Sequence, residues 1–272
     1  MLLKLIKHEF KATANKFYPI YALILITSFI YGNFFNIGYN VLSAYFNIVP
    51  VVLGCALVAQ FVVLLMVTID RFNKSLLGDE GYLMFTLPVT NRQLILSKTI
   101  VTGVWYFITH IVFMLSIMIL TSDMVDYSYM FKGVIGLNSM FMEAVGTVGG
   151  VSVQIAVLIK MLQVGVVGLL TVAKTILIIY LALIIGSLVK RAKIVGLFSY
   201  IAINWVLTTF LGVSTITMLI NSSKVVGVST NILSDLYGLV ATGINVATIG
   251  NLAICIAVME LISYILTNKK EL

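Results

Sequence analysis

The side chains that could take part in chemistry are few, and five of them stand within long apolar runs. These residues are Gln60, His110, Lys174, Asn204 and Glu260. All except Lys174 lie nine to twelve residues from a flanking Lys or Arg, which is about 13 to 18 Å along a helix. Polar groups at that depth in a membrane are costly and usually face the interior of a helix bundle. We call Gln60, His110, Asn204 and Glu260 the polar layer. This layer predicts either a substrate path or a set of hydrogen bonds that hold helices together.

Lys174 raises the same question at a different depth. It precedes Lys190 by sixteen residues, about 24 Å along a helix, and is therefore expected near the outer edge of a hydrocarbon core about 30 Å thick. Its long side chain could reach the outer headgroups from there. Contact with an anionic substrate is the alternative.

The sequence contains no motif that is typical of an enzyme. Cys55 and Cys255 have no C-x-x-C partner, so we expect packing roles for them and no disulfide or metal site. A G-x-x-x-x-G-K-[ST] nucleotide loop is absent, as is any recognisable hydrolase motif. We therefore expect no catalytic residue, no metal site and no cofactor in this chain, and any ATP hydrolysis must come from another chain.

The composition predicts an integral membrane protein. Of the 272 residues, 61% are hydrophobic and only 10% are charged, which leaves too little polar surface for a soluble globule. The apolar runs are continuous rather than alternating, so they predict helices and not a β-barrel. We expect an all-α fold, a six-transmembrane-helix bundle that forms a single transmembrane domain over residues 1–272. The predicted spans are 17–38, 47–70, 99–121, 164–189, 194–219 and 246–267.

The distribution of Lys and Arg predicts the orientation of the chain. Thirteen of the 17 basic residues precede the first predicted span, follow the last, or lie between the second and third or the fourth and fifth. Because short cytoplasmic loops retain basic residues, both termini are expected in the cytoplasm of a multi-pass protein of the cell membrane. This bias also explains the net charge of +7 without nucleic-acid binding.

The N-terminus has the pattern of an amphipathic helix. Apolar residues recur at helical spacing, and the residues between them are polar. The apolar positions are Leu2, Leu3, Ile6, Phe10 and Phe17, and the polar positions are Lys4, His8, Lys11 and Asn15. The stretch is charged for too long to be a cleaved signal peptide. We expect a helix in the membrane interface, acting either as a surface anchor or in contact with a partner.

The segment "GDEGYLMFTLPVTNRQLILSK" between the second and third spans predicts a stiff element. A short apolar helix is expected over 82–87, with acidic residues at its start and Pro88 at its end. Thr90 and Gln93 have capping-box spacing, and Val89 and Leu94 are placed to form a hydrophobic staple around that cap. A second helix should therefore start at Thr90 and continue through Lys98 into the third span.

This segment resembles a known family. The acidic residue, glycine and apolar turn followed by "LP" and "QLILSK" look like the cytoplasmic coupling segment of ABC-2 type permeases, the membrane subunits of ATP-binding-cassette exporters. The opening "LLKLIKHEFKATA", the six spans and the basic tail "TNKKEL" are similar to small bacterial members of that family. The resemblance extends over essentially the whole chain.

The resemblance implies a half-transporter that works with other subunits. Two permease subunits, identical or homologous, would face each other in membrane lipid, and each would contact one of two ATPase subunits that bind ATP and Mg²⁺. The coupling residues carried over from the family are Asp79, Glu80, Gly81, Tyr82, Leu83, Phe85 and Leu87. The expected cargo is an amphipathic or hydrophobic compound, with an antimicrobial or surfactant-like peptide as the leading choice.

Two other functional classes stay open. In addition, two regions of the chain cannot be assigned to a span. The chain could be an ion-coupled carrier or channel that uses Glu260 and His110, or a membrane anchor subunit that transports nothing. The regions 123–160 and 222–245 are too polar and glycine-broken for spans and too apolar for free loops. We expect both to form helices on the outer surface, packed on the bundle.

Overall fold

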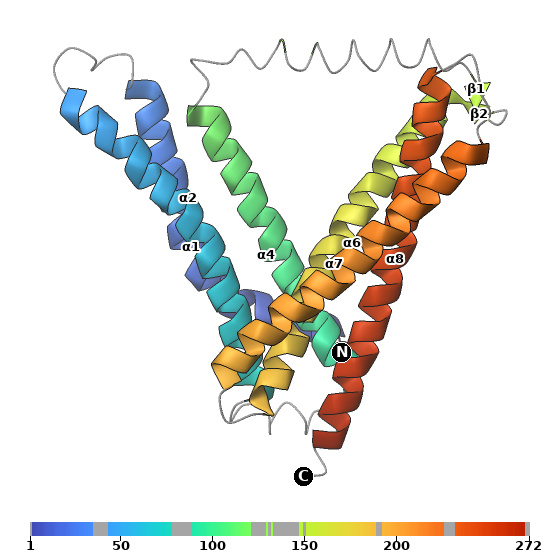
Figure 1. Cartoon of the computed structure of the whole chain (residues 1–272). Coiled ribbons are helices and arrows are strands. Elements are labelled where there is room, and N and C mark those ends of the chain that lie inside the picture. The colour runs from blue at the N-terminus through green and yellow to red at the C-terminus, as the bar shows by residue number, and fades with distance from the viewer. Residues whose placement is uncertain are drawn as a thin grey trace. The chain divides into compact units, whose positions relative to one another are not determined.

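The computed structural model describes residues 2–34, 43–77, 89–120, 147–148, 151–188, 192–225 and 232–269, together with residues 129 and 132. Almost all of the structure in these ranges is helical (Figure 1). The elements are α1 (Leu2–Phe34), α2 (Ser43–Phe72), the π-helix η1 (Asn73–Leu77), α4 (Asn91–Leu120), β1 (Thr147–Val148), β2 (Val151–Ser152), α6 (Val153–Ser187), α7 (Ala192–Val225) and α8 (Ile232–Lys269). The two strands pair antiparallel over two residues each.

The all-α fold and the multi-pass membrane character are confirmed. Five helices in the described ranges are long and apolar enough to cross a membrane, and each contains or overlaps one of the last five predicted spans. These segments are Val51–Leu76, Asn91–Leu120, Leu158–Ser187, Ile194–Met218 and Gly238–Asn268. The first predicted span, 17–38, falls in α1 and continues past the last described residue of that helix.

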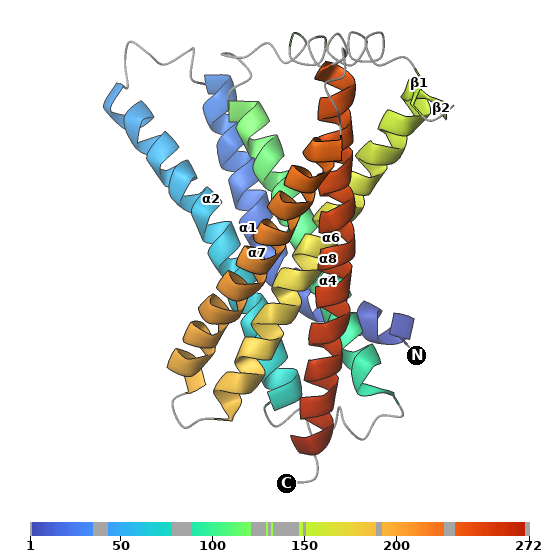
Figure 2. The same ribbon diagram turned by 45° about the vertical axis from the view of Figure 1, so that its right-hand side comes forward.

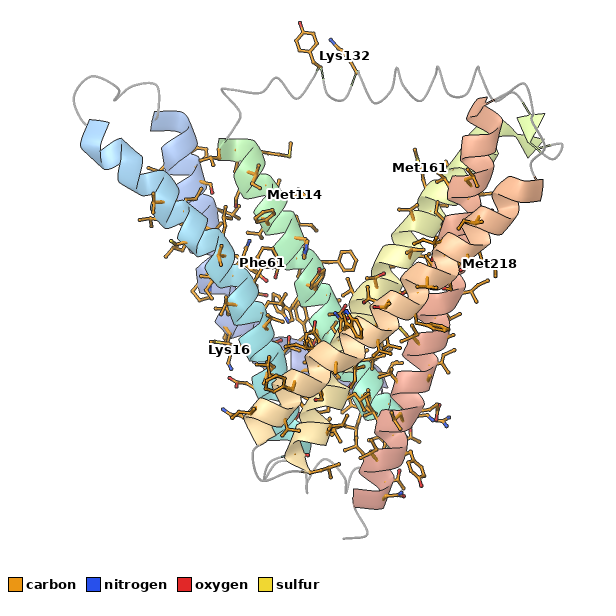
Figure 3. The ribbon with its side chains drawn as sticks, in the orientation of Figure 1. Lys16, Phe61, Met114, Lys132, Met161 and Met218 are labelled. Carbon is orange, nitrogen blue, oxygen red and sulfur yellow. The ribbon has the colours of Figure 1, made fainter. Side chains whose placement is uncertain are left out.

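Large apolar side chains cover the outside of these helices. On α7, Trp205 is 69% exposed and Phe210 is 68% exposed. Figure 3 shows Met161 on α6 and Met218 on α7, and these side chains are also exposed. A surface of this kind is unfavourable in water, since a soluble protein rarely exposes large contiguous apolar patches. It is the surface expected of helices in contact with lipid.

The chain divides into two compact units, Met1–Tyr129 and Met130–Leu272. In the first unit, α1 and α2 pack on each other and both pack on α4. The core of this unit is centred on Trp105, whose ring stacks on Phe10 at 4.7 Å and on Phe17 at 4.5 Å between centroids. Trp105 is only 2% exposed, so its apolar area contributes strongly to holding α1 against α4.

In the second unit, α6, α7 and α8 each contact the other two. A Cβ atom at Gly250 of α8 would lie 2.4 Å from Cδ2 of Leu211 on α7. The absence of a side chain at Gly250 therefore allows the close approach of these two helices. Near the start of α7, Ser199 lies against the α6 carbonyl of Ala182, with 3.5 Å between Oγ and the carbonyl oxygen.

The N-terminal amphipathic segment is not a separate helix. It is continuous with the apolar segment that follows it, in the single helix α1. Figure 2 shows the first turns of α1, beside the N-terminus, inclined to the rest of the helix. Pro19 lies inside α1 and has no N–H to bond to the carbonyl of Asn15, which favours a bend there without ending the helix.

The prediction of surface helices in 123–160 and 222–245 is wrong for the residues that the structure describes. Residues 153–160 form the first turns of α6, residues 222–225 end α7, and residues 232–245 begin α8. The polar residues that argued against long helices pair between α6 and α8. Lys160 and Gln163, for example, both bond to Asn245. Polar side chains are tolerated in long membrane helices when a neighbouring helix supplies their partners.

Candidate functional site

The predicted coupling segment is represented in the structure by its two flanks. Asp79, Glu80, Gly81, Tyr82, Leu83, Phe85 and Leu87 all fall in 78–88, outside the described residues. On one side η1 ends at Leu77, and on the other the chain resumes at Val89.

The predicted cap of the following helix is confirmed. The backbone N–H of Gln93 donates to Oγ1 of Thr90 at 3.3 Å, and the N–H of Thr90 donates to Oε1 of Gln93 at 3.4 Å. This reciprocal pair is a capping box, which satisfies two N–H groups that the helix itself cannot. The helix α4 begins at Asn91, directly after the cap.

A buried ion network lies close to both flanks in sequence. The Glu9 carboxylate on α1 accepts a hydrogen bond from Nζ of Lys98 on α4 at 2.5 Å, and its other oxygen lies 3.7 Å from a guanidinium nitrogen of Arg71 on α2. Glu9 is 9% exposed and Lys98 is 4% exposed. We call these three residues the Glu9 network. It joins α1, the end of α2 and the start of α4 through one carboxylate.

Further contacts extend the α1–α4 interface away from the Glu9 network. Nε1 of Trp105 donates to Oγ1 of Thr13 at 2.7 Å, and the hydroxyls of Tyr21 and Thr109 are hydrogen-bonded at 2.6 Å. The pairs occur in the same order along both helices, so α1 and α4 run parallel. These polar pairs, with the rings stacked on Trp105, fix α1 along α4.

The sequence interpretation missed the role of Glu9. It treated the N-terminal helix as a surface element and assigned this acidic residue to no site. A usable signal was present, because Glu9, Thr13, Phe17 and Tyr21 follow one another at intervals of four residues. Such residues share one face of a helix, and here that face packs on α4.

Within the first unit, the polar layer is represented by Gln60 and His110. Gln60 is 1% exposed, and its amide oxygen and nitrogen have no hydrogen-bond partner among the described residues. Nδ1 of His110 lies 2.9 Å from the carbonyl oxygen of Tyr106. Phe61 on α2, which is labelled in Figure 3, packs against the ring of His110 at 5.3 Å between centroids. The described contacts of His110 are thus a local backbone group and aromatic rings.

In the second unit, Asn204 on α7 and Glu260 on α8 are both half-buried. The four residues of the predicted layer are therefore divided between two units, each described by itself. A single layer formed by all four stays a prediction.

The expected position of Lys174 at the outer edge of its span, with a side chain that reaches the outer headgroups, stays a prediction. The apolar segment that contains it, Leu158–Ser187, starts before residue 164, where the sequence interpretation began the span. Lys174 lies about 24 Å from the first residue of that segment and about 20 Å from the last by helical rise, near its middle. Its side chain is buried, with 8% exposure.

Lys174 belongs to a line of polar side chains between α6 and α8. Nζ of Lys160 donates to Oε1 of Gln163 and to Oδ1 of Asn245, each at 2.9 Å. Nε2 of Gln163 donates to Oδ1 of Asn245 at 2.8 Å and Oγ1 of Thr248 at 3.1 Å. Further along, Asn251 bonds to Thr171, and Cys255 lies against the carbonyl of Leu170. We call this line the α6–α8 polar stripe.

The two cysteines have different surroundings. Cys255 is half-buried in the α6–α8 polar stripe, in agreement with the expected packing role. Cys55 is exposed on α2, in an open apolar groove that also includes Gly54 and Ala59, so the packing role expected for it is not seen. In the part of the chain described, no group of three or more His, Cys, Asp or Glu side chains could hold a metal ion.

Comparison with known proteins adds no family assignment. No family model matches this chain, and neither the curated proteins nor the solved structures contain a match.

Proposed function

We propose that this chain is the permease subunit of an ATP-driven exporter of the ABC-2 type, and that segment 78–88 is the surface on which a separate ATPase docks. The observation that carries the proposal is the Glu9 network. Arg71 and Lys98 lie on opposite sides of segment 78–88 in sequence, and both bind the same buried carboxylate of α1.

This arrangement supports a role in transmitting force. A loop that only connects two spans needs no buried charge at its base, and burying charges is costly unless they are paired. Here the Glu9 network ties the helices on both sides of the segment to α1, and the capping box fixes the start of α4. A displacement imposed on 78–88 would therefore move α1, α2 and α4 together.

The composition of the segment indicates the chemistry of the partner. Asp79 and Glu80 stand next to an apolar stretch that ends at Pro88. Adjacent acidic residues are poorly suited to anionic headgroups and well suited to a basic groove on a protein. The ATPase would bind ATP and Mg²⁺, and two copies of it would act on a pair of permease subunits, identical or homologous, with both termini of this chain in the cytoplasm.

The proposed activity is outward transport of an amphipathic or hydrophobic compound across the cell membrane. The buried polar groups of the second unit support a cargo that carries at least one polar group. A peptide with antimicrobial or surfactant-like character fits this description.

The test is co-purification of an ATP-binding-cassette ATPase with the tagged chain, together with measurement of its ATP hydrolysis. Reversing both charges, with Asp79→Lys and Glu80→Lys, should release the ATPase or uncouple it, because attraction to a basic groove becomes repulsion. Leu83→Asp should weaken docking by placing a charge in the apolar stretch. Glu271→Lys, a charge reversal in the basic tail, is the matched control and should change neither recovery nor hydrolysis. Normal recovery of a coupled ATPase with both 78–88 variants would contradict the proposal.

A further inference from the structure

We infer that the α6–α8 interface contains, near the middle of α6, a binding site for an acylated amino acid carboxylate, the group found at the C-terminus of a peptide and in N-acyl amino acids. The site consists of Thr171 and Lys174 on α6 and Asn251 and Cys255 on α8. Binding at this site does not require an ATPase. The further claim that the bound molecule is the transported cargo rests on the exporter function proposed above.

The first observation is a contrast between the two lysines of α6. Lys160 and Lys174 lie fourteen residues apart, which places them on nearly the same face of the helix. The ammonium of Lys160 donates to two amide oxygens, those of Gln163 and Asn245. Lys174 is more deeply buried, yet it forms no ion pair or hydrogen bond with any residue that the structure describes. An ammonium in that position calls for an anionic partner.

The second observation is an amide oxygen with no partner. Asn251 is 4% exposed, and its Oδ1 has no hydrogen-bond partner among the described residues. The hydroxyl of Thr171 donates to the carbonyl of Val167 at 2.8 Å, so its oxygen is left to accept. The amide nitrogen of Asn251 donates to that oxygen at 3.4 Å. This sequence of bonds fixes the orientation of the amide and leaves its oxygen available to a donor.

The two groups belong to one local site. Thr171 and Lys174 are one turn apart on α6, as are Asn251 and Cys255 on α8, and side chains at these spacings are neighbours on a helix surface. Sγ of Cys255 lies 3.6 Å from the carbonyl oxygen of Leu170, which is one turn before Lys174 on α6. Glu260 stands nine residues after Asn251, about 180° around α8 at about 100° per residue, and so lies on another face of the helix. Thr171 is exposed, which gives the site an opening at the helix surface.

The pair of functional groups selects the ligand. Lys174 offers a positive charge and N–H donors, which suit a carboxylate. Asn251 offers one acceptor, which suits an N–H group. A carboxylate with an amide N–H on the adjacent carbon satisfies both, whereas a fatty acid has the carboxylate alone. The apolar residues around the site suit the rest of an amphipathic molecule.

The experiment measures binding to the purified full chain in lipid nanodiscs. The probes are a dansylated leucine tripeptide with a free C-terminal carboxylate, the same tripeptide as its C-terminal amide, N-dodecanoyl-leucine and dodecanoic acid. The wild-type chain should bind the tripeptide acid or the acylated leucine at least about tenfold more tightly than the tripeptide amide and dodecanoic acid. Binding of the tripeptide acid alone identifies a peptide as the source of the carboxylate, and binding of the acylated leucine alone identifies an acyl amino acid.

Variants then assign the roles. Lys174→Gln should abolish the preference for the tripeptide acid over the amide, and Lys174→Arg should retain it. Asn251→Leu should weaken binding of the acid and leave the weak binding of dodecanoic acid unchanged. Lys160→Gln is the control and should bind like the wild-type chain.

Equal binding of acid and amide by the wild-type chain would overturn the inference, and this comparison needs no variant. The inference would also be overturned if dodecanoic acid bound as tightly as N-dodecanoyl-leucine. It would likewise be overturned if Lys174→Gln kept the wild-type preference for the tripeptide acid over the amide. Failure to recover an ATPase would count against the exporter function alone, because the binding measurement uses no ATPase.

Discussion

The α1–α4 interface and the α6–α8 interface are both pairs of parallel helices joined by polar side chains, but they differ in how these side chains are paired. On α1 and α4, Glu9 binds Lys98, Thr13 accepts from Trp105, and Tyr21 bonds to Thr109. On α6 and α8, Lys160 donates to two amide oxygens. Lys174 and Oδ1 of Asn251 form no hydrogen bond with the described residues. The first interface is built to hold helices together. The second also contains the Lys174 ammonium and the Asn251 amide oxygen, which have no partner among the described residues.

The difference in pairing between the two interfaces shows when a polar side chain in an apolar helix indicates a binding site. A polar side chain deep in a membrane protein indicates a binding site only after its partners within the protein have been accounted for. By this standard Lys98 is structural, although it is more deeply buried than Lys174. Lys174 is the better candidate for contact with a ligand.

The largest effect is expected from Glu9→Gln. The change removes the carboxylate charge that the buried ammonium of Lys98 contacts, and breaking a buried ion pair in this way typically costs about 3 to 5 kcal/mol. Thermal unfolding in mild detergent should show a large loss of stability. His8→Gln, at an exposed neighbouring position, is the control and should behave like the wild-type chain. A Glu9→Gln protein as stable as the control would mean that the Glu9 network does not hold α1 in place.

Lys174→Met should change stability in the opposite direction. Lys174 has no partner among the described residues, so an apolar side chain of similar length removes a desolvation cost that reaches several kcal/mol for a buried ion. The melting temperature without ligand should therefore rise. Lys160→Met should lower it, because that lysine loses two hydrogen bonds. If both changes destabilise the protein, the two lysines are equivalent and the distinction between paired and unpaired groups fails.

Gln60→Leu tests whether buried polar groups with and without partners also differ in their effect on stability in the first unit. The amide of Gln60 is buried without a hydrogen-bond partner in the described ranges, and such a group carries a desolvation cost of about 1 to 3 kcal/mol. Leucine should therefore raise the free energy of unfolding. Gln163→Leu is the matched control, and it should destabilise because Gln163 bonds to Lys160, Asn245 and Thr248. A loss of stability with Gln60→Leu would show that this amide has partners in the membrane.

The features that could be predicted from the sequence are those with local causes. The spans follow from continuous apolar runs, and the cap at Thr90 follows from a residue three positions away. Glu9 was missed because its partner Lys98 is 89 residues distant. The early start of α6 was missed because the partners of Lys160 and Gln163 lie on another helix, at Asn245. Periodicity within one segment cannot detect partners of this kind.

The smallest effect is expected from Thr90→Ala, which tests the flank that joins α4 to segment 78–88. The change removes the side-chain acceptor for the N–H of Gln93, and loss of such a cap typically costs about 1 kcal/mol. The loss should be confined to the first turn of α4 and should appear as faster hydrogen exchange at residues 91–94, with little change in melting temperature.

Thr99→Ala is the matched control for this change. Among the described residues the Thr99 hydroxyl bonds to the carbonyl of Ile95 within the same helix, and its removal should leave exchange in the first turn as it was. If the proposed docking on 78–88 requires a fixed start of α4, Thr90→Ala should also reduce ATPase coupling while ATPase recovery stays normal. Unchanged exchange at residues 91–94 would show that the capping box does not stabilise this end of the helix, and the mechanical argument would then depend on the Glu9 network alone.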